Sequence, residues 1–540
     1  MRIDRLLLLT GTGAALTIGT FQTLPAQQGA KHIDEQAEQA ADVPAEANAV
    51  PNGGREWWSP GDGKPFPRLI EYDNPYGRSA ILNSEAPLET KEHPFFEPLG
   101  PNGRACVSCH QPADGMSLSV ASIQERWEET DGKDPIFAAI DGSNCPNLPQ
   151  GVASSHSLLL ERGLFRIFLP WPADDPWSDG KIEPEFTIEV VRDPTGCNLS
   201  KEYGLANPDN PMISVWRRPR MVANLPYVVH RNFGIGAFVG KTGEPALRDP
   251  ENGEPVNMNF FADARVPTLK VQALEASVTH LQMVDGMSKE QIDRIRAFED
   301  QIWAAQVHDD VAGDLTSGAG SKYAGPENLA NGDIGFLGNN ITRWVFPLDA
   351  EWGEKQSGLT DAQNERRASI RRGQQIFHFR TFWIKDSMHL NTVGLGNPVK
   401  RTCATCHGMH MTGLDTANGW MDIGTTNLPW AKEEPLNPWN EREEQMPLFK
   451  ITCRADVPPH PFLGRVIYTQ DPGRALISGK CNDVGTIVMQ QFRAIASRAP
   501  YFSNGSAANL RELIDFYDRR YSIGYTEREK RDLENFMGTL

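Results

Sequence analysis

The stretches CVSCH, at Cys106–His110, and CATCH, at Cys403–His407, repeat one pattern in a chain of 540 residues. Each has two cysteines three positions apart and a histidine directly after the second cysteine. A single stretch of this kind is compatible with a redox-active thiol pair, with half of a zinc site, or with an anchor for a prosthetic group. The rest of the sequence must therefore distinguish among these three readings.

The spacing favours the prosthetic group, because two thiols three positions apart can add to the two vinyl groups at one edge of a haem. The adjoining histidine then lies under the iron as a ligand. A thioredoxin-like pair needs a parallel-sheet pattern nearby, and a zinc site needs a second close pair of ligands; the sequence contains neither. We therefore predict two covalently bound c-type haems. Their predicted attachment residues and iron ligands are Cys106, Cys109 and His110 for one, and Cys403, Cys406 and His407 for the other.

The N-terminus has the order of an export signal. Arg2 and Arg5 precede the apolar stretch LLLLTGTGAALTIGTF, and Ala26 ends the small-residue segment before a polar one. The apolar stretch is short and interrupted for a membrane span, although an uncleaved anchor is the alternative. We predict a signal peptide over 1–26, a disordered acidic tether over 27–56, and a periplasmic or otherwise exported protein with no stable membrane insertion after cleavage.

The other four of the eight cysteines also fit an exported protein. An even number of cysteines in an oxidising compartment predicts disulfide bonds, and buried free thiols are the alternative. The predicted pairs are Cys145 with Cys197 and Cys453 with Cys481.

Composition limits the partners. Hydrophobic residues make up 39% and charged residues 23% of the chain, as in folded soluble proteins. The formal net charge of -17 argues against nucleic-acid binding, which needs clustered Lys and Arg. An acidic protein can instead attract a basic protein partner, such as a cationic electron carrier.

Periodicity predicts a mainly α protein, with two cytochrome c-like helical haem domains and a β-hairpin inserted in the first. The stretches at 163–171 and 185–193 alternate apolar and polar residues and are predicted to form that hairpin. The stretch at 288–308 is predicted to be one helix, with a capping box at Ser288 and Gln291. The predicted segments of the body are an N-terminal haem domain over 57–308, a Gly-rich junction over 309–361, and a C-terminal haem domain over 362–540.

The sixth position of each iron separates a carrier from an enzyme, because an open position can bind peroxide or oxygen. Near the second motif, Met409, His410 and Met411 follow His407 too closely to reach the opposite face of a haem. Met489 lies far enough downstream to offer a thioether ligand to the second haem, and a core methionine is the alternative.

Three further stretches resemble a known family. FRAIASRAPYFSNGS, over 492–506, is similar to a Leu-Arg-Asn, Ala-Pro-Tyr-Phe, His-Asp/Asn-Gly-Ser segment, and RRGQQIF, over 371–377, to a Gly-x-x-Leu-Phe lead-in. ADARVPTLKVQ, over 262–272, is similar to a Trp-Asp-Gly-Arg segment followed by a glutamine. These segments are those of the bacterial di-haem cytochrome c peroxidase family. The resemblance runs from about Phe95 to the C-terminus, with an insertion between the first motif and Arg217.

The resemblance implies roles for the two haems and for residues near the first. Peroxide would be reduced at the haem of His110, and electrons would enter at the haem of His407. In the family, a Gln and a Glu ten residues later line the peroxide pocket; here these positions are Gln272 and Gln282. Because an amide cannot carry the proton as a carboxyl does, His280 is the expected substitute. Ala262 replaces the Trp that lies between the haems in the family.

The sequence thus predicts a haem-dependent oxidoreductase that resembles cytochrome c peroxidases and reduces hydrogen peroxide with electrons from a small cytochrome or copper protein. A pure di-haem electron carrier without peroxidase activity is one alternative, and another haem-dependent oxidation is a second. The family often holds calcium between its domains, but the sequence contains no acidic loop that specifies a calcium site.

Overall fold

Pairing between distant parts of the chain builds the framework around both motifs. The structure is a computed structural model that describes residues 50–51, 55–85, 87–175, 178–229, 248–256, 260–316, 324–331, 350–387, 398–407, 420–427 and 444–540. The predicted signal peptide over 1–26 and nearly all of the predicted tether over 27–56 lie outside the described residues. The excluded ligand candidates Met409, His410 and Met411 lie outside them as well.

The largest sheet brings together the start of the folded body and a strand more than two hundred residues further along. The hairpin formed by β2 and β3 pairs antiparallel with β7, and Ile81 lies opposite Ala304. Both side chains are fully buried, so this pairing closes a core. In sheet order the strands are β1 (Val50–Pro51), β2 (Leu69–Asn74), β3 (Gly77–Asn83), β7 (Ile302–Asp309) and β8 (Gly313–Asp314).

Helix α5 (Lys289–Gln301) begins as predicted, because the Ser288 hydroxyl accepts the backbone N–H of Gln291 in a capping box. The predicted continuation of this helix to 308 is wrong, since β7 begins at Ile302. Residues 302–309 pair along β3, and the apolar side chains of Ile302 and Trp303 are buried there. Strand pairing therefore outweighs the helical propensity of this segment.

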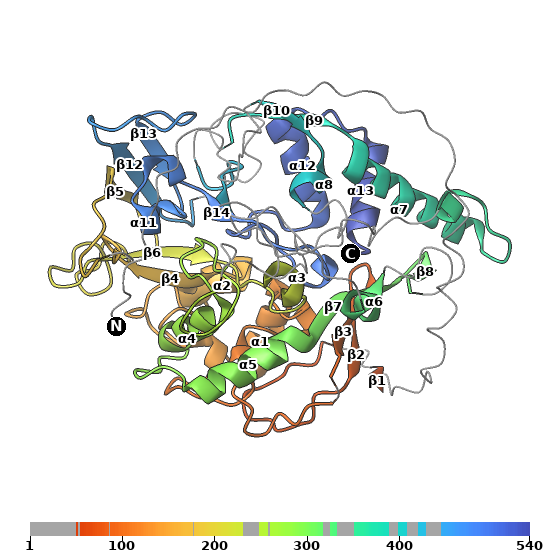
Figure 1. Cartoon of the computed structure of the whole chain (residues 1–540), viewed down its shortest axis with the longest axis horizontal. Helices are drawn as coiled ribbons and strands as arrows, with labels where there is room; N and C mark the ends of the chain where they lie inside the picture. The colour runs from red at the N-terminus through yellow and green to blue at the C-terminus, as the bar shows by residue number, and fades with distance from the viewer. Residues whose placement is uncertain are drawn as a thin grey trace. The chain divides into compact units, whose positions relative to one another are not determined.

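The predicted hairpin between 163–171 and 185–193 is also wrong, although each stretch does contain a strand. Strand β4 (Phe165–Pro170) pairs with β6 (Met212–Arg217). Strand β5 (Phe186–Arg192) instead pairs with β12 (Leu448–Cys453), which pairs in turn with β13 (Val466–Thr469) (Figure 1). The alternating pattern identifies a half-buried strand but does not specify its partner.

These pairings overturn the predicted fold class. The structure is 31% helical and 20% strand, with five sheets in the described ranges, so the protein is mixed α and β. It is not mainly α with two cytochrome c-like helical domains and an inserted hairpin. The sheet of β5, β12 and β13 takes strands from both sides of the predicted junction over 309–361, and residues 48–540 form one unit. The boundaries at 308 and 361 stay predictions from sequence.

Helices surround the second motif (Figure 1). They are α7 (Asp361–Phe379), α12 (Leu510–Tyr521) and α13 (Glu527–Met537), and the motif itself forms the short helix α8 (Cys403–Cys406). In the sequence, Asn509 with Glu512 and Thr526 with Glu529 predict the N-terminal caps of α12 and α13. Both caps are confirmed, because Asn509 and Thr526 accept backbone N–H groups from Glu512 and Glu529. Helices α7 and α13 approach closely at Gly373, where an added Cβ would overlap the carbonyl group of Asp532. Only glycine fits this crossing.

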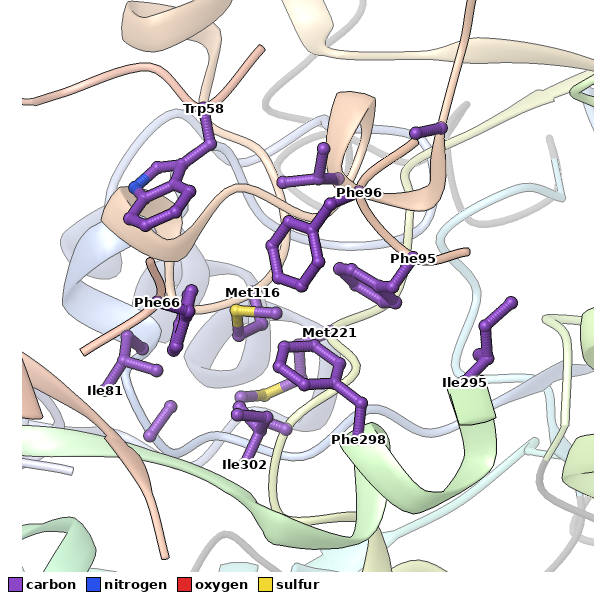
Figure 2. Packing of buried hydrophobic residues seen from close by; sticks show 14 of the residues in the cluster. Trp58, Phe66, Ile81, Phe95, Phe96, Met116, Met221, Ile295, Phe298 and Ile302 are labelled. Atoms are coloured by element: carbon purple, nitrogen blue, oxygen red, sulfur yellow. The ribbon is translucent and has the colours of Figure 1, made fainter. Parts of the chain in front are cut away.

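An aromatic core lies beside the first motif (Figure 2). Figure 2 shows Phe95, Phe96 and Phe298 packed together, and the ring centroids of Phe95 and Phe298 are 4.6 Å apart. The centroid of Phe95 is also 6.4 Å from that of His110. This core therefore supports the histidine of the first motif from one side.

Both predicted cysteine pairs lie at disulfide distance. The Cα atoms of Cys145 and Cys197 are 5.3 Å apart, and those of Cys453 and Cys481 are 5.9 Å apart. The second pair ties β12 to the segment after α11. The remaining described elements are α1 (Val120–Thr130), α2 (Ser157–Arg162), α3 (Leu225–Val229), α4 (Leu269–Thr279), α6 (Gly325–Ala330), α11 (Ala475–Ser478), β9 (Phe382–Ile384), β10 (Val399–Arg401), β11 (Trp420–Met421) and β14 (Ile487–Val488).

Candidate functional site

Each motif opens onto a large cavity. The first cavity, defined by Cys106, Cys109 and His110, encloses about 1570 Å³ of unfilled space that includes open solvent. The second cavity, defined by Cys403, Cys406 and His407, encloses about 1490 Å³ by the same measure. Both are lined mainly by apolar and aromatic side chains, as small-molecule and cofactor sites commonly are.

In the first cavity, one ring nitrogen of His110 forms a hydrogen bond to the backbone. Its Nδ1 lies 3.3 Å from the carbonyl oxygen of Met116, which can only accept, so Nδ1 carries the proton. Burial lowers the pKa of His110 to about 4, and the ring is therefore neutral at pH 7. This leaves Nε2 unprotonated, which is the state of a metal-ligating imidazole. Met116 contributes only its backbone here, because its side chain packs in the aromatic core.

In the second cavity, His407 packs on an aromatic ring. The centroids of His407 and Phe492 are 4.3 Å apart, with 31° between the ring planes. Burial lowers the pKa of His407 to about 4, so this ring is also neutral at pH 7. Its Nδ1 is buried and has no hydrogen-bond partner within the described ranges. Buried polar atoms in proteins nearly always have a partner. A neutral His407 whose Nδ1 has none among the described residues therefore suits a site that holds a further group.

The four motif cysteines line the cavities and take no part in disulfide bonds. Burial raises the pKa of Cys109 and of Cys403 to about 12, so both are protonated thiols at pH 7. Among the residues that the structure describes, no group of three or more His, Cys, Asp or Glu is arranged to hold a metal ion, and no calcium site is found there.

The two cavities share a wall formed by Arg218, Pro219 and the segment 489–491. Met489 belongs to this shared wall, so the predicted ligand of the second haem borders both cavities. Its backbone is fixed by Arg220, whose guanidinium donates to the carbonyl oxygens of Val488 at 3.0 Å and Met489 at 2.5 Å. The position of Met489 therefore does not by itself select one cavity.

Three arginines lie at this wall or beside it: Arg218 and Arg498 are buried, and Arg220 is half-buried. The guanidinium groups of Arg218, Arg220 and Arg498 donate to backbone carbonyl groups, and none has a carboxylate at ion-pair distance in the part of the chain that is described. Burial lowers the pKa of each to about 10, which still leaves them charged at pH 7. Uncompensated buried cations are costly, so this region suits an anionic group such as the carboxylates that a haem carries.

The structure separates the predicted residues of the peroxide pocket. Gln272 and His280, on α4 and at its C-cap, line the first cavity, as does Ala262. Gln282 is not among the lining residues; it lies beyond the end of α4 in a left-handed conformation, with φ of 58°. Helix α4 ends at Thr279, before Gln282 is reached. A residue ten positions after Gln272 therefore does not lie at the cavity, although the family resemblance implies that it should.

Two residues near the first cavity escaped the sequence analysis. The carboxylate of Asp141 accepts from Nδ1 of His280 at 2.5 Å, although 139 residues separate the two. Glu299 lines the cavity and is 3% exposed; burial raises its pKa to about 8, and its Oε2 has no hydrogen-bond partner in the described residues. A signal for Glu299 existed, because it follows Ile295 by four positions on the apolar face of α5. No local signal pointed to Asp141.

Comparison with known proteins finds no matching protein family, no matching curated protein and no matching solved structure. None of the described helices is long and apolar enough to cross a membrane.

Proposed function

We propose that this protein is an exported di-haem c-type cytochrome related to the bacterial di-haem cytochrome c peroxidases. It reduces hydrogen peroxide at the first cavity with electrons that enter at the second. The observation that carries the proposal is the pair of cavities: each contains one Cys-x-x-Cys-His motif with a half-buried, neutral histidine, and the two share a wall.

The residues present fit a haem in each cavity. Cys106 and Cys109 would hold one through thioether bonds and Cys403 and Cys406 the other, and His110 and His407 would bind the two irons. A bound haem supplies an iron that changes between two oxidation states and binds peroxide where its sixth position is open. Arg218, Arg220 and Arg498, at the shared wall or beside it, would offset the negative charge of carboxylates on the cofactor.

At the first cavity the chain's own side chains manage water and protons. Reduction of one hydrogen peroxide molecule to two water molecules consumes two electrons and two protons. His280 is 27% exposed and lines the cavity, so its ring can pass protons between solvent and the bound substrate. Gln272 lies on α4 about two turns before His280 and also lines the cavity, so its side-chain amide can donate a hydrogen bond that orients the peroxide.

The second cavity is suited to electron entry from a small cytochrome or copper protein. Phe377 and Phe382 line this cavity, and their neighbours Phe379 and Trp383 are 69% and 53% exposed. Exposed aromatic side chains are enriched where proteins bind one another. Phe379 and Trp383 are close in sequence to Phe377 and Phe382 of the cavity wall. A donor protein bound at these exposed rings would therefore lie near the cofactor.

A pure electron carrier is the second candidate function. It is favoured by the presence of two further potential ligands at the cavities, since His280 lines the first and Met489 borders both. If both irons were fully ligated, peroxide would have no place to bind.

Three measurements on the secreted protein test the proposal. Mass spectrometry should show the added mass of two porphyrins, and zinc in place of iron would refute the cofactor assignment. Hydrogen peroxide should oxidise a reduced cytochrome or dye faster than free haem does; no excess rate would refute the peroxidase. Electron paramagnetic resonance should show a high-spin ferric signal, whereas low-spin signals alone would support the carrier.

A further inference from the structure

We propose that Asp141 is a positioning residue that holds the ring of His280 with Nε2 available to the first cavity. The role of His280 in turnover rests on the proposed function, but its orientation by Asp141 does not. Neither Asp141 nor its own partner, Arg104, belongs to the motifs or to the stretches that carry the family resemblance.

The contact between the two side chains is short and sheltered. Nδ1 of His280 lies 2.5 Å from Oδ2 of Asp141, and the side chain of Asp141 is 1% exposed. His280 is the C-cap of α4, and its backbone N–H donates to the carbonyl oxygen of Ala276 at 2.8 Å. The backbone of His280 is therefore held by α4, and its ring is held by the buried carboxylate of Asp141.

Arg104 holds Asp141 in turn. Its guanidinium forms an ion pair with Oδ1 of Asp141 and donates to the carbonyl oxygens of Pro135 at 2.7 Å and Ile136 at 2.5 Å. Asn102 donates to the carbonyl oxygen of His280 at 2.8 Å. The segment that leads into the first motif therefore contacts both His280, through Asn102, and Asp141, through Arg104. Arg104 stands two positions before Cys106, which ties the ring of His280 to the motif itself.

The charge of Asp141 settles which nitrogen of His280 carries the proton. Burial alone would raise the pKa of Asp141, but the charge of Arg104 and the hydrogen bond from His280 hold that pKa below its ordinary value. Asp141 is therefore a carboxylate and can only accept, so Nδ1 of His280 must donate. A histidine held in this way by a carboxylate has a fixed tautomer and orientation, and its other nitrogen is free to bind or to exchange a proton.

The direct test is the tautomer of His280 in the wild-type protein. Nitrogen NMR of the secreted holoprotein, labelled with ¹⁵N-histidine, reduced and kept under carbon monoxide, reports the two ring nitrogens at alkaline pH. His280→Gln identifies the signal. We expect a protonated Nδ1 and an unprotonated Nε2; the reverse assignment, or a rapid mixture of the two forms, would overturn the proposal. This readout does not depend on peroxide turnover.

A substitution supplies the second arm. Asp141→Asn retains the size of the side chain but can donate as well as accept, so His280 should lose its single tautomer. We expect kcat/KM for peroxide to fall about 10- to 100-fold, the usual effect of removing a group that orients a functional histidine. The matched control is Asp532→Asn, which alters another buried aspartate paired with an arginine, Arg372, outside the cavity linings. An equal fall in both variants would show a general structural effect and overturn the proposal.

The two arms separate the inference from the proposed function. If wild-type protein has no peroxidase activity but shows the Nδ1-protonated ring, and Asp141→Asn scrambles it, positioning stands and the peroxidase falls. If turnover is present and Asp141→Asn changes neither the NMR spectrum nor kcat/KM, positioning falls and the peroxidase stands.

Discussion

His280 is the residue on which the chemistry of the first cavity can be tested most directly. His280→Gln removes the group that can carry protons while retaining a polar side chain. We expect the peroxidase rate to fall about 10²- to 10⁴-fold, the usual contribution of general acid–base catalysis. Steady-state kinetics over a range of pH checks this, because a lost proton carrier also changes the pH profile.

The control for this substitution is Gln282→Asn. Gln282 does not line the first cavity, and asparagine tolerates its left-handed backbone. The rate of this variant should match that of the wild type. A large loss there, with none in His280→Gln, would restore Gln282 as the residue that the family resemblance implies.

Glu299 gives a prediction on stability against pH. Its pKa is raised by burial from 4.5 to about 8, so the folded protein keeps this carboxyl protonated while the unfolded chain ionises. Between pH 4.5 and about 8 the unfolded state thus binds fewer protons, and stability falls as pH rises. Glu299→Gln should remove this fall and raise the free energy of unfolding by roughly 1–4 kcal/mol near the upper end of that range. Urea denaturation at several pH values measures it.

The difference should vanish below pH 4.5, where both states of the wild type are protonated. The exposed Glu290, on the same helix and with no ion pair among the described residues, supplies the control substitution Glu290→Gln. If Glu299→Gln shows the same stability gain at all pH values, the group does not titrate in this range in the folded protein.

At the scale of elements, the crossing of α7 and α13 decides how the helices around the second motif pack. Gly373→Ala places a methyl group against the backbone of α13 at Asp532, and the helices must separate. Overpacking of this kind costs about 1–3 kcal/mol. Chemical denaturation should show that loss, whereas Gln375→Ala, at an exposed position of the same helix, should change stability by less than about 0.5 kcal/mol.

The elements also show where sequence patterns suffice. Capping boxes placed the starts of α5 and α13 correctly, because a cap is made by residues three positions apart. The end of α5 was misplaced, since only the presence of β3 opposite turns 302–309 into a strand. Likewise, β5 was recognised as a strand, but its partner β12 lies beyond the second motif.

At the scale of the whole molecule, electron delivery depends on the surface beside the second cavity. Trp383→Ala removes an exposed ring next to the cavity wall without opening the core. With a donor protein we expect a several-fold lower kcat/KM for the donor, and with a small chemical reductant no change. Val466→Ala, an exposed apolar position on β13, serves as the control and should change neither rate. Equal loss with both reductants would place the defect in the cavity and not in docking.

The candidate site could be predicted from sequence only in part. The motif residues, Gln272 and His280 all line the cavities; the fixed spacing of the motifs identified the first, and the family resemblance pointed to the other two. Gln282 was misplaced by counting past the end of a helix. The wall shared by the two cavities, with Arg218 and Met489, joins segments that lie far apart in the sequence, so no local pattern could predict it.

The sequence by itself determined what depends on short-range chemistry: the two Cys-x-x-Cys-His motifs, the helix caps and the existence of the strands β4 and β5. Only the tertiary structure decided which strands pair, that the fold is mixed α and β, and that Asp141 meets His280 across 139 residues. The physical reason is that an alternating pattern shows which face of a strand is buried but does not identify the strand or core against which it packs. Many different pairings are therefore compatible with the same pattern. The choice among them is made by the packing of the whole chain at once.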